Sequence, residues 1–576
     1  MSNALTLPIT AINGQPLTGE QSNYLTGFFA GIAARGQRFG DVEPMPAVGK
    51  TVSHEDLIFE ERVKRELHPL DAYPVLIDHA ATNKTPEKEE IFRFKWNGLF
   101  YLTPNKEAFM ARLRIPGGLL RTFQLRELAN VARELTTGYV QITTRANLQM
   151  RLIQPKDTPE LLRRIQSVGL HTRGAGADNI RNLTANPTSG IDPHEIIDVM
   201  PFCNEMAQII INDRAFYDLP RKFNIAYDGG GLIGTVEDTN DIGCKAVKVG
   251  EEVFFRIALG GATGHKAFAR DIGVLVKPAE LNKVVAAVVR VYIANGNRTD
   301  RKKARLKHLL EKWTLEQYLA ETEKLLGYQL ERAPLDPAAI QYPGQKLPHS
   351  HVGVYSQKQK GLNYVGVAIP VGHITPKQMI RIAEIADLYG SGEIRLTVWQ
   401  NFIIPNVPDH FVATVKKALR KVGFDTEQSN LRSGLIACTG NSYCKFAQAN
   451  TKGHAIELVD YLDKRLKLDL PVNIHLTGCP NSCAQHYMGD IGLLGTKAKV
   501  GGESVDGYHI FVGGGFGANQ AVGRQVFNAI DFESAKPLVE KMLRGYLRHR
   551  TGGETFQAFT ARHDLNTLQA IFSNDE

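Results

Sequence analysis

Long hydrophobic runs are missing from this chain of 576 residues. No stretch approaches the roughly 18 uninterrupted apolar residues that a membrane-spanning helix needs, so we expect no membrane partner. The first ten residues, M-S-N-A-L-T-L-P-I-T, lack the basic stretch and apolar core of a secretory signal, and they are too poor in arginine and serine for a transit peptide. We therefore expect a cytoplasmic protein.

Cysteine is scarce as well, with six residues at positions 203, 244, 438, 444, 479 and 483. In a reducing compartment, so few thiols are not expected to form a disulfide framework. Cys203 and Cys244 are isolated in apolar or strand-like surroundings, which is typical of core residues. The other four lie close together and need another explanation.

A strong excess of charge of one sign is also absent. The chain has 68 Lys and Arg against 60 Asp and Glu, a formal net charge of +8, and its basic residues are spread out without a recognition motif. We therefore expect no nucleic-acid partner, whereas an acidic protein or an anionic substrate suits the mild positive charge. The composition, 43% apolar and 22% charged, is that of a globular protein with several compact units.

A nicotinamide- or flavin-binding motif is missing too. The glycine run F-V-G-G-G-F-G at residues 511–517 lacks the complete G-x-G-x-x-G pattern and the acidic residue that follows it in dinucleotide-binding folds. A similar run, L-G-G-A-T-G, occurs at residues 259–264. This recurrence favours a loop beside a cofactor, at the seam of a duplicated structure, over a Rossmann turn.

The chain contains an internal repeat. Residues 115–170 align with residues 369–424 without a gap, at a constant offset of 254. Both copies begin with apolar residues at helical spacing, continue with a strand-like segment, and end in a second helix that stops at V-G-L or V-G-F. The apolar positions are Leu125, Leu128, Ala129 and Ala132 in the first copy and Met379, Ile382, Ala383 and Ala386 in the second.

The repeat continues at offsets between 249 and 253, through pairs such as D-L-P at residues 218–220 and 469–471. It predicts two α+β halves, roughly 96–345 and 346–560, each with a strand–helix–strand–helix unit followed by a longer mixed segment. Residues 1–95 lie outside the repeat, and turns such as V-E-P-M-P-A-V-G suggest a segment that wraps over the halves. The seam between two fused copies can hold a large ligand.

Four clustered cysteines occur only in the second half, as C-x5-C and C-x3-C separated by 34 residues. Structural zinc sites use C-x2–4-C knuckles, and the five-residue spacing is too loose for them, whereas an iron–sulfur cluster accepts wider spacing. Four small buried hydrophobic side chains are the alternative. It is less favoured because the cysteines lie beside Gly, Pro, Asn and Ser, whose backbone N–H groups can bond to sulfur.

The segments A-C-T-G-N-S-Y-C at residues 437–444 and T-G-C-P-N-S-C at residues 477–483 resemble the cluster signature of siroheme-dependent nitrite and sulfite reductases. The resemblance covers nearly the whole chain, including both halves. It implies a [4Fe-4S] cluster bound by four thiolates, of which that of Cys483 is also the axial ligand of the siroheme iron. The implied cluster ligands are Cys438, Cys444, Cys479 and Cys483.

The resemblance also implies the fold. We expect an α+β protein of two pseudo-twofold-related halves, each with a ferredoxin-like half-repeat and a mixed-sheet domain. The half-domains are expected at residues 96–171 and 346–425, the siroheme and anion-binding domain at 172–345, and the cluster and siroheme domain with its C-terminal tail at 426–576. Residues 1–95 are the expected wrapping segment.

Cationic residues gather in the half that lacks the four cysteines. A bound oxyanion needs cations around it, although each such residue taken alone is more typical of a solvated surface. The resemblance places Arg112, Arg181, Lys222 and Asn224 in the substrate pocket. In the repeat, Arg112, Lys222 and Asn224 align with Gly366, Asn473 and His475 of the second half.

Further basic residues are expected to serve the cofactor and the electron donor. Siroheme carries eight carboxylates, which require Arg and Lys groups, and the resemblance matches Arg145, Gln149 and Arg221 to positions that contact it. The segment 299–313, T-D-R-K-K-A-R-L-K-H-L-L-E-K-W, is expected to form an exposed amphipathic helix. Within it, Arg301–Lys307 is a candidate docking site for the donor.

The segment K-F-N at residues 222–224 favours nitrite over sulfite. Sulfite reductases of this family generally have Lys-x-Lys here, and nitrite reductases Lys-x-Asn. Sulfite is largely a dianion near neutral pH and nitrite is a monoanion, and one unit charge about 4 Å away is worth roughly 4 kcal/mol at an effective dielectric of about 20. The loss of one lysine therefore penalises the dianion more.

The resemblance thus predicts a monomeric enzyme that reduces nitrite to ammonium with six electrons. The donor must be external because the chain lacks a nicotinamide or flavin motif, and ferredoxin is the donor that the family implies. Three alternatives remain: an assimilatory sulfite reductase, a monooxygenase of the cobalamin pathway, and a non-catalytic iron–sulfur redox protein without a tetrapyrrole.

Overall fold

The computed structural model describes residues 11–12, 15–17, 57–84, 86–101, 108–344, 346–347 and 349–573. Residues 1–52 form one unit and residues 53–576 another. In the first unit, β1 (Ala11–Ile12) pairs antiparallel with β2 (Gln15–Pro16). Most of the expected wrapping segment up to residue 56 lies outside the described residues. No helix in the described ranges is long and apolar enough to cross a membrane.

The second unit begins with three helices. They are α2 (Phe59–Glu66), α3 (Tyr73–Thr82) and α4 (Lys88–Phe94). This segment bonds to the first half, because Lys64 Nζ donates to the carbonyl of Leu219 at 3.0 Å, and Val63 and Phe92 pack with Trp96 of that half. The segment therefore shares a small core with residues 177–219.

Two five-stranded sheets carry the first part of each repeat copy. One has the order β18-β6-β7-β4-β3 and the other β16-β17-β20-β19-β5. Their strands are β3 (Leu99–Phe100), β4 (Phe109–Arg112), β5 (Leu119–Arg121), β6 (Val140–Ile142), β7 (Leu148–Ile153), β16 (Gly353–Ser356), β17 (Leu362–Val367), β18 (His373–Ile374), β19 (Glu393–Leu396) and β20 (Phe402–Pro408). Helices α5 (Thr122–Leu135) and α6 (Thr158–Ser167) belong to the first copy, and α11 (Pro376–Tyr389) and α12 (Val412–Val422) to the second.

The two copies exchange one strand each. β5 of the first copy pairs with β19 of the second, with Leu120 opposite Ile394, and β18 of the second copy pairs with β6 of the first, with Ile374 opposite Val140. β5 and β18 are themselves repeat equivalents, 254 positions apart. Each sheet is therefore completed by the other half of the chain, which the sequence repeat did not predict.

The same helix start occurs in both copies. Thr375 caps α11, because its Oγ1 accepts from the backbone N–H of Gln378 at 3.3 Å and its own N–H donates to Gln378 Oε1 at 3.0 Å. In the first copy, the N–H of Arg121 donates to Gln124 Oε1 at 2.9 Å. This reciprocal capping satisfies N–H groups that a first helical turn leaves without partners, so both helices begin at equivalent positions.

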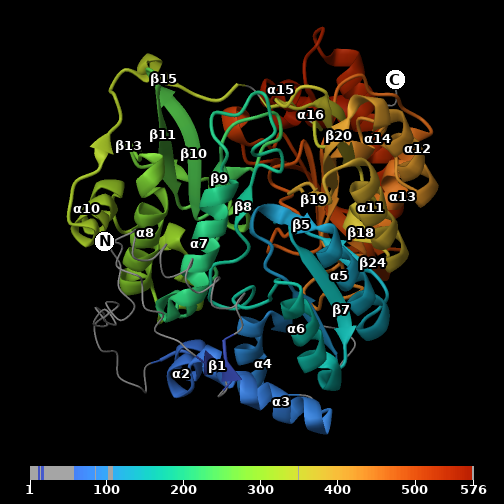
Figure 1. The fold of residues 1–576 in the computed structure, drawn as a ribbon. Coiled ribbons are helices and arrows are strands. Elements are labelled where there is room, and N and C mark those ends of the chain that lie inside the picture. The colour runs from blue at the N-terminus through green and yellow to red at the C-terminus, as the bar shows by residue number, and fades with distance from the viewer. Residues whose placement is uncertain are drawn as a thin grey trace. The chain divides into compact units, whose positions relative to one another are not determined.

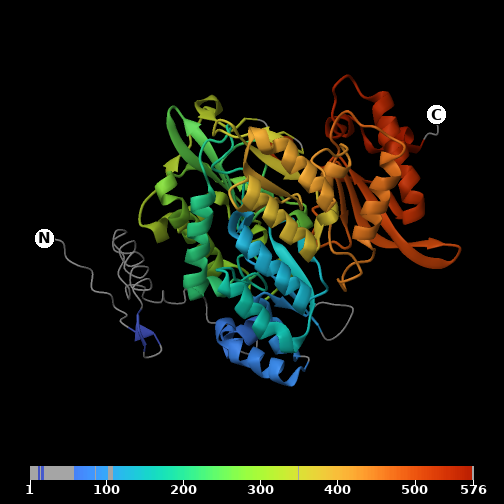
Figure 2. The ribbon, with the colours of Figure 1, turned by 45° about the vertical axis from the view of Figure 1, so that its right-hand side comes forward.

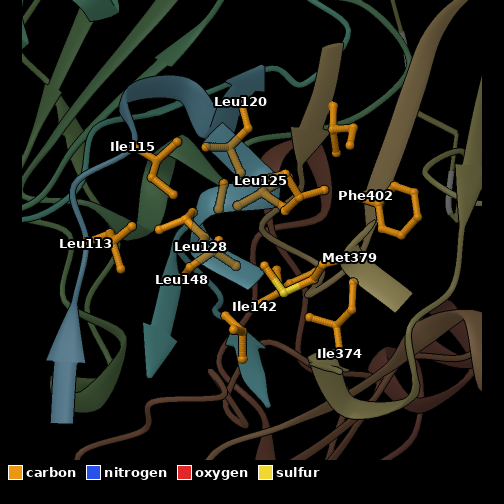
Figure 3. Packing of buried hydrophobic residues seen from close by; sticks show 14 of the residues in the cluster. Leu113, Ile115, Leu120, Leu125, Leu128, Ile142, Leu148, Ile374, Met379 and Phe402 are labelled. Atoms are coloured by element: carbon orange, nitrogen blue, oxygen red, sulfur yellow. The ribbon is translucent and has the colours of Figure 1, made fainter. Parts of the chain in front are cut away.

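Helices α5 and α11 pack against each other in the largest core. The eight apolar positions that define the repeat are all buried, which confirms the predicted helical faces. Figure 3 shows Leu125 and Leu128 in one cluster with Met379. The core thus joins the two copies.

The second part of each copy is a mixed sheet. The first has the order β12-β11-β10-β9-β8 with β15 beside β10, and the second the order β21-β22-β23-β24-β25. The strands are β8 (Thr184–Ala185), β9 (Ile225–Asp228), β10 (Ile242–Val249), β11 (Glu252–Leu259), β12 (Arg270–Asp271), β15 (Ile340–Gln341), β21 (Leu435–Ala437), β22 (Ile474–Thr477), β23 (Ile491–Val500), β24 (Glu503–Val512) and β25 (Arg524–Asp531). The fold is therefore α+β, as predicted.

Helices accompany both mixed sheets (Figure 1). The first sheet has α7 (Met200–Asn212), α8 (Leu281–Asn295), α9 (Leu306–Leu309) and α10 (Leu315–Leu326), together with the strand pair β13 (Val274–Leu275) and β14 (Glu331–Arg332). The second sheet has α13 (Thr451–Asp463), α14 (Phe532–His549), α15 (Phe556–Ala561) and α16 (Leu565–Ser573). Cys203 on α7 and Cys244 on β10 are fully buried, which confirms them as core residues.

The register of the parallel strands corrects one sequence alignment. Ile225 lies opposite Ile242 in the first sheet, and Ile474 lies opposite Ile491 in the second. Asn224 is therefore equivalent to Asn473, and its alignment with His475 was wrong by two residues. The first half has two more residues than the second between the D-L-P segment and the strand. Lys222 lies in this insertion and has no counterpart.

Candidate functional site

Two neighbouring parallel strands deliver the cysteines to one edge of the second mixed sheet. Cys438 follows β21, and Cys479 follows β22 by one residue, Gly478. Because parallel strands end at the same edge, their following residues meet. The N–H of Cys438 donates to the carbonyl of Leu476 at 3.0 Å, and the N–H of Gly478 donates to Cys438 Sγ at 3.1 Å.

The two cysteine loops are packed tightly against each other. The N–H of Gln448 donates to the carbonyl of Gly478 at 2.8 Å. A Cβ on Gly478 would lie 2.5 Å from the Cβ of Ala447, so only glycine fits there. Ser482 adopts a left-handed φ of 53° just before Cys483, and the carbonyl of Cys483 accepts from Thr144 Oγ1 of the first half at 3.0 Å.

The four thiols influence one another. Loss of hydration, together with nearby Cys438, Cys479 and Cys444, raises the pKa of the Cys483 thiol to about 11, and Lys222 opposes this shift. In the described part of the chain, no three His, Cys, Asp or Glu side chains converge on a point that one metal ion could occupy. The four thiols therefore share one region of the structure.

The first half carries no thiol at the equivalent place. Asn186 follows β8 in the same way as Cys438 follows β21. The N–H of Gly229 donates to Asn186 Oδ1 at 2.7 Å, and this bond corresponds to the one from the N–H of Gly478 to Cys438 Sγ. Asn186 Nδ2 in turn donates to buried Asp228 at 3.1 Å, and Lys346 Nζ donates to the same carboxylate at 2.9 Å. The duplicated position is therefore closed by polar contacts and an ion pair.

Two of the predicted anion ligands come together at one carbonyl. Arg112 Nη1 donates to the carbonyl of Ala175 at 3.4 Å, and Arg181 Nη1 donates to the same oxygen at 3.2 Å. The Arg112 guanidinium also lies 4.5 Å from the ring centroid of Phe100. Burial lowers the pKa of Arg181 well below its ordinary value, and neighbouring Arg112 lowers it further. Neither guanidinium group forms an ion pair with a carboxylate of the described residues, so the two form a cationic pair.

Lys222 completes this cationic group. Burial lowers the pKa of its ammonium to about 7, with further lowering by Arg305, and the Cys483 thiol opposes this shift. No hydrogen bond or ion pair joins Lys222 Nζ to any residue in the described ranges. Lys222 is half-buried, and a cation held partly away from water without a partner is costly, so this lysine is suited to an anion that is supplied from outside the chain.

Asn224 is fixed by a buried ion pair. Its N–H and its Nδ2 donate to Asp241 Oδ2 at 2.8 and 3.2 Å, and Arg305 donates to both oxygens of the same carboxylate at 2.8 to 3.2 Å. Asp241 has no exposed surface, and Arg305 is 7% exposed. The Asn224 amide therefore has a defined orientation beside Lys222.

The three predicted siroheme contacts lie in different surroundings. Arg145 Nη1 donates to Asn240 Oδ1, and burial lowers the pKa of Arg145 to about 10 while Asp241 raises it. Gln149 Oε1 accepts from Arg151 at 3.0 Å, which places Gln149 on the side of the cysteine loops. Arg221 lies 3.7 Å from Asp178, a buried carboxylate that is already bound by Arg301.

The sequence predicted an exposed amphipathic helix over residues 299–313, and this prediction is wrong. It forms a single turn at Arg301–Lys303 and then the four-residue α9. Arg301 binds Asp178 through two hydrogen bonds of 2.7 and 2.8 Å, and Arg305 is the buried partner of Asp241. Two cations of the predicted docking run, Arg301 and Arg305, thus form ion pairs with interior carboxylates. Sequence periodicity does not predict such pairs.

The glycine run at 511–517 approaches the end of the cysteine segment. A Cβ on Gly514 would lie 2.5 Å from the carbonyl oxygen of Gly489, and the N–H of Gly517 donates to Asp238 Oδ2 of the first half at 2.8 Å. The run therefore lies at the seam between the halves, as the sequence predicted. Its contact with a cofactor stays a prediction.

Sequence reasoning missed three kinds of residue at this site. Asp241 and Arg305 hold Asn224, and the recurring N-D-I-G and G-D-I-G segments were a signal for the carboxylate. Arg114, 1% exposed, donates to the carbonyls of Arg181 and Ile180 at 2.9 and 2.6 Å and so braces the pocket loop. Two further buried cations, Arg151 and Lys452, lie next to the cysteine loops, and no pattern in the sequence predicted their position.

Two family profiles match this chain. The profile described as "Nitrite and sulphite reductase 4Fe-4S domain" matches residues 176–330 and 428–575, and the profile described as "Nitrite/Sulfite reductase ferredoxin-like half domain" matches residues 101–168 and 355–422. Each profile matches twice, once in each half, and together they cover more than half of the sequence.

Individual relatives are similar over most of their length. A ferredoxin–nitrite reductase from Synechococcus elongatus is 36% identical over 459 residues, which cover 78% of this chain and 88% of the relative. The chloroplastic ferredoxin–nitrite reductase of Spinacia oleracea is 33% identical over 503 residues, 84% of each chain. The structure of the Mycobacterium tuberculosis NirA protein superposes with a TM-score of 0.83 at 28% identity and covers 92% of this chain and 98% of that one.

Proposed function

The chain belongs to the nitrite and sulphite reductase family, and on this basis we propose that it reduces nitrite to ammonium with six electrons from ferredoxin. Relatives from a cyanobacterium and a plant carry the name ferredoxin–nitrite reductase. The observation that best supports the proposal is that Arg112 and Lys222 both interact electrostatically with the Cys483 thiol, that Arg181 lies beside Arg112, and that none of the three forms an ion pair with a carboxylate of the described residues. A cationic pocket beside a metal ligand suits an oxyanion.

The residues fit the two cofactors of the family. Four thiols from two loops, with a backbone N–H directed at one sulfur, suit a [4Fe-4S] cluster on Cys438, Cys444, Cys479 and Cys483. The surplus of cations, to which Arg145 and Arg221 belong, suits the carboxylates of siroheme, and Cys483 would bind both metal centres. When bound, siroheme supplies the iron that holds the substrate and receives electrons from the cluster.

The side chains of the pocket have distinct tasks. Arg112 and Arg181 hold the anion by charge and hydrogen bonds, because a guanidinium stays protonated at neutral pH. Lys222, whose pKa is about 7, delivers protons as the N–O bonds break, since a general acid works best when its pKa lies near the working pH. Asn224, oriented by Asp241, binds nitrite by hydrogen bonding without adding charge.

The choice of nitrite over sulfite rests on residue 224. The site holds one lysine, Lys222, and the neighbouring Asn224 carries no charge. When one cation is missing, a dianion loses more electrostatic binding energy than a monoanion. The difference is roughly 4 kcal/mol per unit charge at about 4 Å, before desolvation is counted. The alternative, an assimilatory sulfite reductase, would need a further cation here.

Ferredoxin is proposed as the donor, and its docking surface is proposed near the cysteine loops. Lys445 and Phe446 follow Cys444 directly, and both are exposed, Phe446 to 49%. Lys445 Nζ lies 5.3 Å from the ring centroid of Phe446. An exposed apolar side chain with a cation beside it suits a small acidic protein, and it lies next to a cluster ligand.

We propose domain boundaries at 96–171, 172–345, 346–425 and 426–576, with residues 1–95 as a wrapping segment. The protein is proposed to act as a monomer in the cytoplasm.

Turnover with both anions tests the function. The purified holoprotein is supplied with reduced ferredoxin and either nitrite or sulfite, and the ammonium formed and the ferredoxin oxidised are measured. We expect six ferredoxins oxidised for each ammonium, because ferredoxin carries one electron. Faster turnover of sulfite would favour the alternative, and a protein whose spectrum lacks a siroheme band in the red would contradict both.

A further inference from the structure

Two buried cations lie against the cysteine loops. Arg151, on β7 of the first half, is 3% exposed, and Lys452, on α13 of the second half, is 7% exposed. Neither makes an ion pair with a carboxylate in the described part of the chain, where their polar partners are neutral. A buried charge without a counter-charge is costly in a protein interior.

Other buried cations of the described residues are satisfied differently. Lys64, Arg93, Arg305 and Arg395 each contact a carboxylate. Arg114 is surrounded by oxygen acceptors at its three guanidinium nitrogens. Arg151 and Lys452 therefore differ from the other buried cations. They lie in one region, because both contribute to lowering the pKa of His373 and Arg151 also lowers that of Lys452.

Arg151 touches the neighbours of two cluster ligands. Its Nη2 donates to Oγ1 of Thr439, the residue after Cys438, at 2.6 Å. Its guanidinium carbon lies 5.6 Å from the ring centroid of Tyr443, the residue before Cys444. Burial lowers the pKa of Arg151, and the thiols of Cys444 and Cys438 are among the groups that raise it again.

Lys452 approaches the same ligand from the second half of the chain. Its Nζ donates to the carbonyl of Val371 and, at 3.4 Å, to that of Ala437, the residue before Cys438. The preceding residue, Thr451, has its Oγ1 3.5 Å from Cys438 Sγ. Arg151 and Lys452 thus flank Cys438 from two different halves of the chain.

We propose that Arg151 and Lys452 are the counter-charges of the iron–sulfur cluster and that they raise its reduction potential. A cluster held by four thiolates is an anion, and reduction adds one more negative charge. Nearby cations therefore stabilise the reduced form more than the oxidised form, as net charge and local contacts are known to do for such clusters. This role does not depend on which anion the enzyme reduces.

The repeat supports a specialised role. Arg151 aligns with Pro405 at the offset of 254, so the first half supplies a cation at a place where the second half has none. The cluster lies in the second half, and Arg151 reaches it from β7 across the seam. Siroheme carboxylates are the other negative charges that could balance Arg151, and the experiment separates the two.

The test is a redox titration of the cluster in the purified holoprotein, followed by electron paramagnetic resonance. We expect Arg151→Gln and Lys452→Gln each to lower the midpoint potential by about 59 mV, a tenfold loss in the one-electron equilibrium constant for reduction. Arg151→Lys keeps the charge and is expected to stay close to the wild type. Lys445→Gln is the matched control, because it removes the same charge one residue from Cys444 but at an exposed position that solvent screens.

Several results would overturn the proposal. Unchanged potentials in both glutamine variants would do so, and so would equal shifts in Arg151→Gln and Arg151→Lys. A variant that loses siroheme absorbance while its cluster potential stays the same would assign Arg151 to the tetrapyrrole. If Arg151→Gln fails to load a cluster, retention of iron and sulfide in Arg151→Lys supports the counter-charge role, and their loss in both contradicts it.

Discussion

The proposed preference for nitrite rests on single residues of the pocket. Lys222 lies in a two-residue insertion that the second half lacks, and Asn224 is the second residue after this insertion. The charge of Asp241 is already balanced by Arg305, so Asn224 adds only hydrogen-bonding capacity to the pocket. We therefore propose that substrate preference depends on position 224, where this chain has a neutral amide.

Asn224→Lys is expected to raise sulfite turnover relative to nitrite turnover by at least about tenfold. The added ammonium stabilises a dianion more than a monoanion. A tenfold change in the ratio of turnover requires about 1.4 kcal/mol, which is less than the roughly 4 kcal/mol of Coulomb energy that one more unit charge supplies. The measurement is kcat/KM for both anions with the same reductant. Asn224→Gln keeps a neutral amide and serves as the control, and an unchanged ratio in Asn224→Lys would count against the charge argument.

Lys222 is expected to make nitrite binding pH-dependent. Burial lowers its pKa to about 7, so the ammonium is charged below pH 7 and neutral above it. Nitrite stabilises the charged form, and binding above pH 7 therefore takes up a proton and weakens by up to tenfold for each pH unit. Titration of nitrite from pH 6 to 9 measures this slope. Lys222→Arg stays charged throughout, and a slope that persists in it would show that another group titrates.

Packing of elements decides whether the thiols can meet. The carboxyl ends of β21 and β22 place Cys438 and Cys479 next to each other, and the contact of Gly478 with Ala447 sets the separation of their loops. The long hairpin of β23 and β24 follows directly, and it extends to the right in Figure 2. The cysteine geometry thus depends on a sheet edge and on one glycine.

Gly478→Ala is expected to reduce cluster content by more than half. The added Cβ would lie 2.5 Å from the Cβ of Ala447, and real contacts of this kind are longer, so the two loops must move apart. Iron and acid-labile sulfide per chain are the measurement. Gly552→Ala is a matched control, because no atom lies within 4 Å of a Cβ there. Full iron and sulfide in Gly478→Ala would mean that the loops are held elsewhere.

The whole second unit is held together by strand exchange. β5 and β18 each complete a sheet of the opposite half, and the largest core includes side chains from both copies. The halves are therefore not independent folding units, although each contains a complete copy of the repeat. The site at their seam depends on both.

A protease site inserted between Tyr342 and Pro343 is expected to leave the halves associated after cleavage. Both residues lie in the connection between the halves, and Tyr342 is 52% exposed. The exchanged strands would have to leave their sheets before the halves could separate, which exposes apolar surface. Size-exclusion chromatography of the cleaved protein measures this. Two separate peaks of half size would contradict the role of the exchanged strands, and uncleaved protein with the same insertion is the control.

Lys445→Glu is expected to raise KM for ferredoxin severalfold at low salt, and less at high salt, because exposed charges are screened within about 8 Å at 0.15 M. Turnover with a small-molecule reductant should not change. Lys302→Glu is the control, since Lys302 is an exposed residue of the run that the sequence suggested as the docking site. An effect of Lys302→Glu without one of Lys445→Glu would restore that earlier assignment.

The sequence by itself determined the duplication, the α+β class, the buried faces of the repeat helices and the family. These features are local or periodic: apolar spacing such as that of Leu125 and Leu128 follows from burial of one helix face, and a cysteine motif needs only its own loop. The pairing of Asn224 with His475 failed because a two-residue insertion changes no local pattern.

Only the tertiary structure decided which distant strands and charged side chains of the chain pair with each other. It showed that β5 and β18 change places, that Arg301 and Arg305 belong to interior carboxylates, and that Arg151 reaches the cysteine loops from the other half. Strand pairing and the neutralisation of buried charge join residues that are far apart in the chain. One sequence contains no periodic signal for such pairs, because their free energy arises only when the distant segments meet.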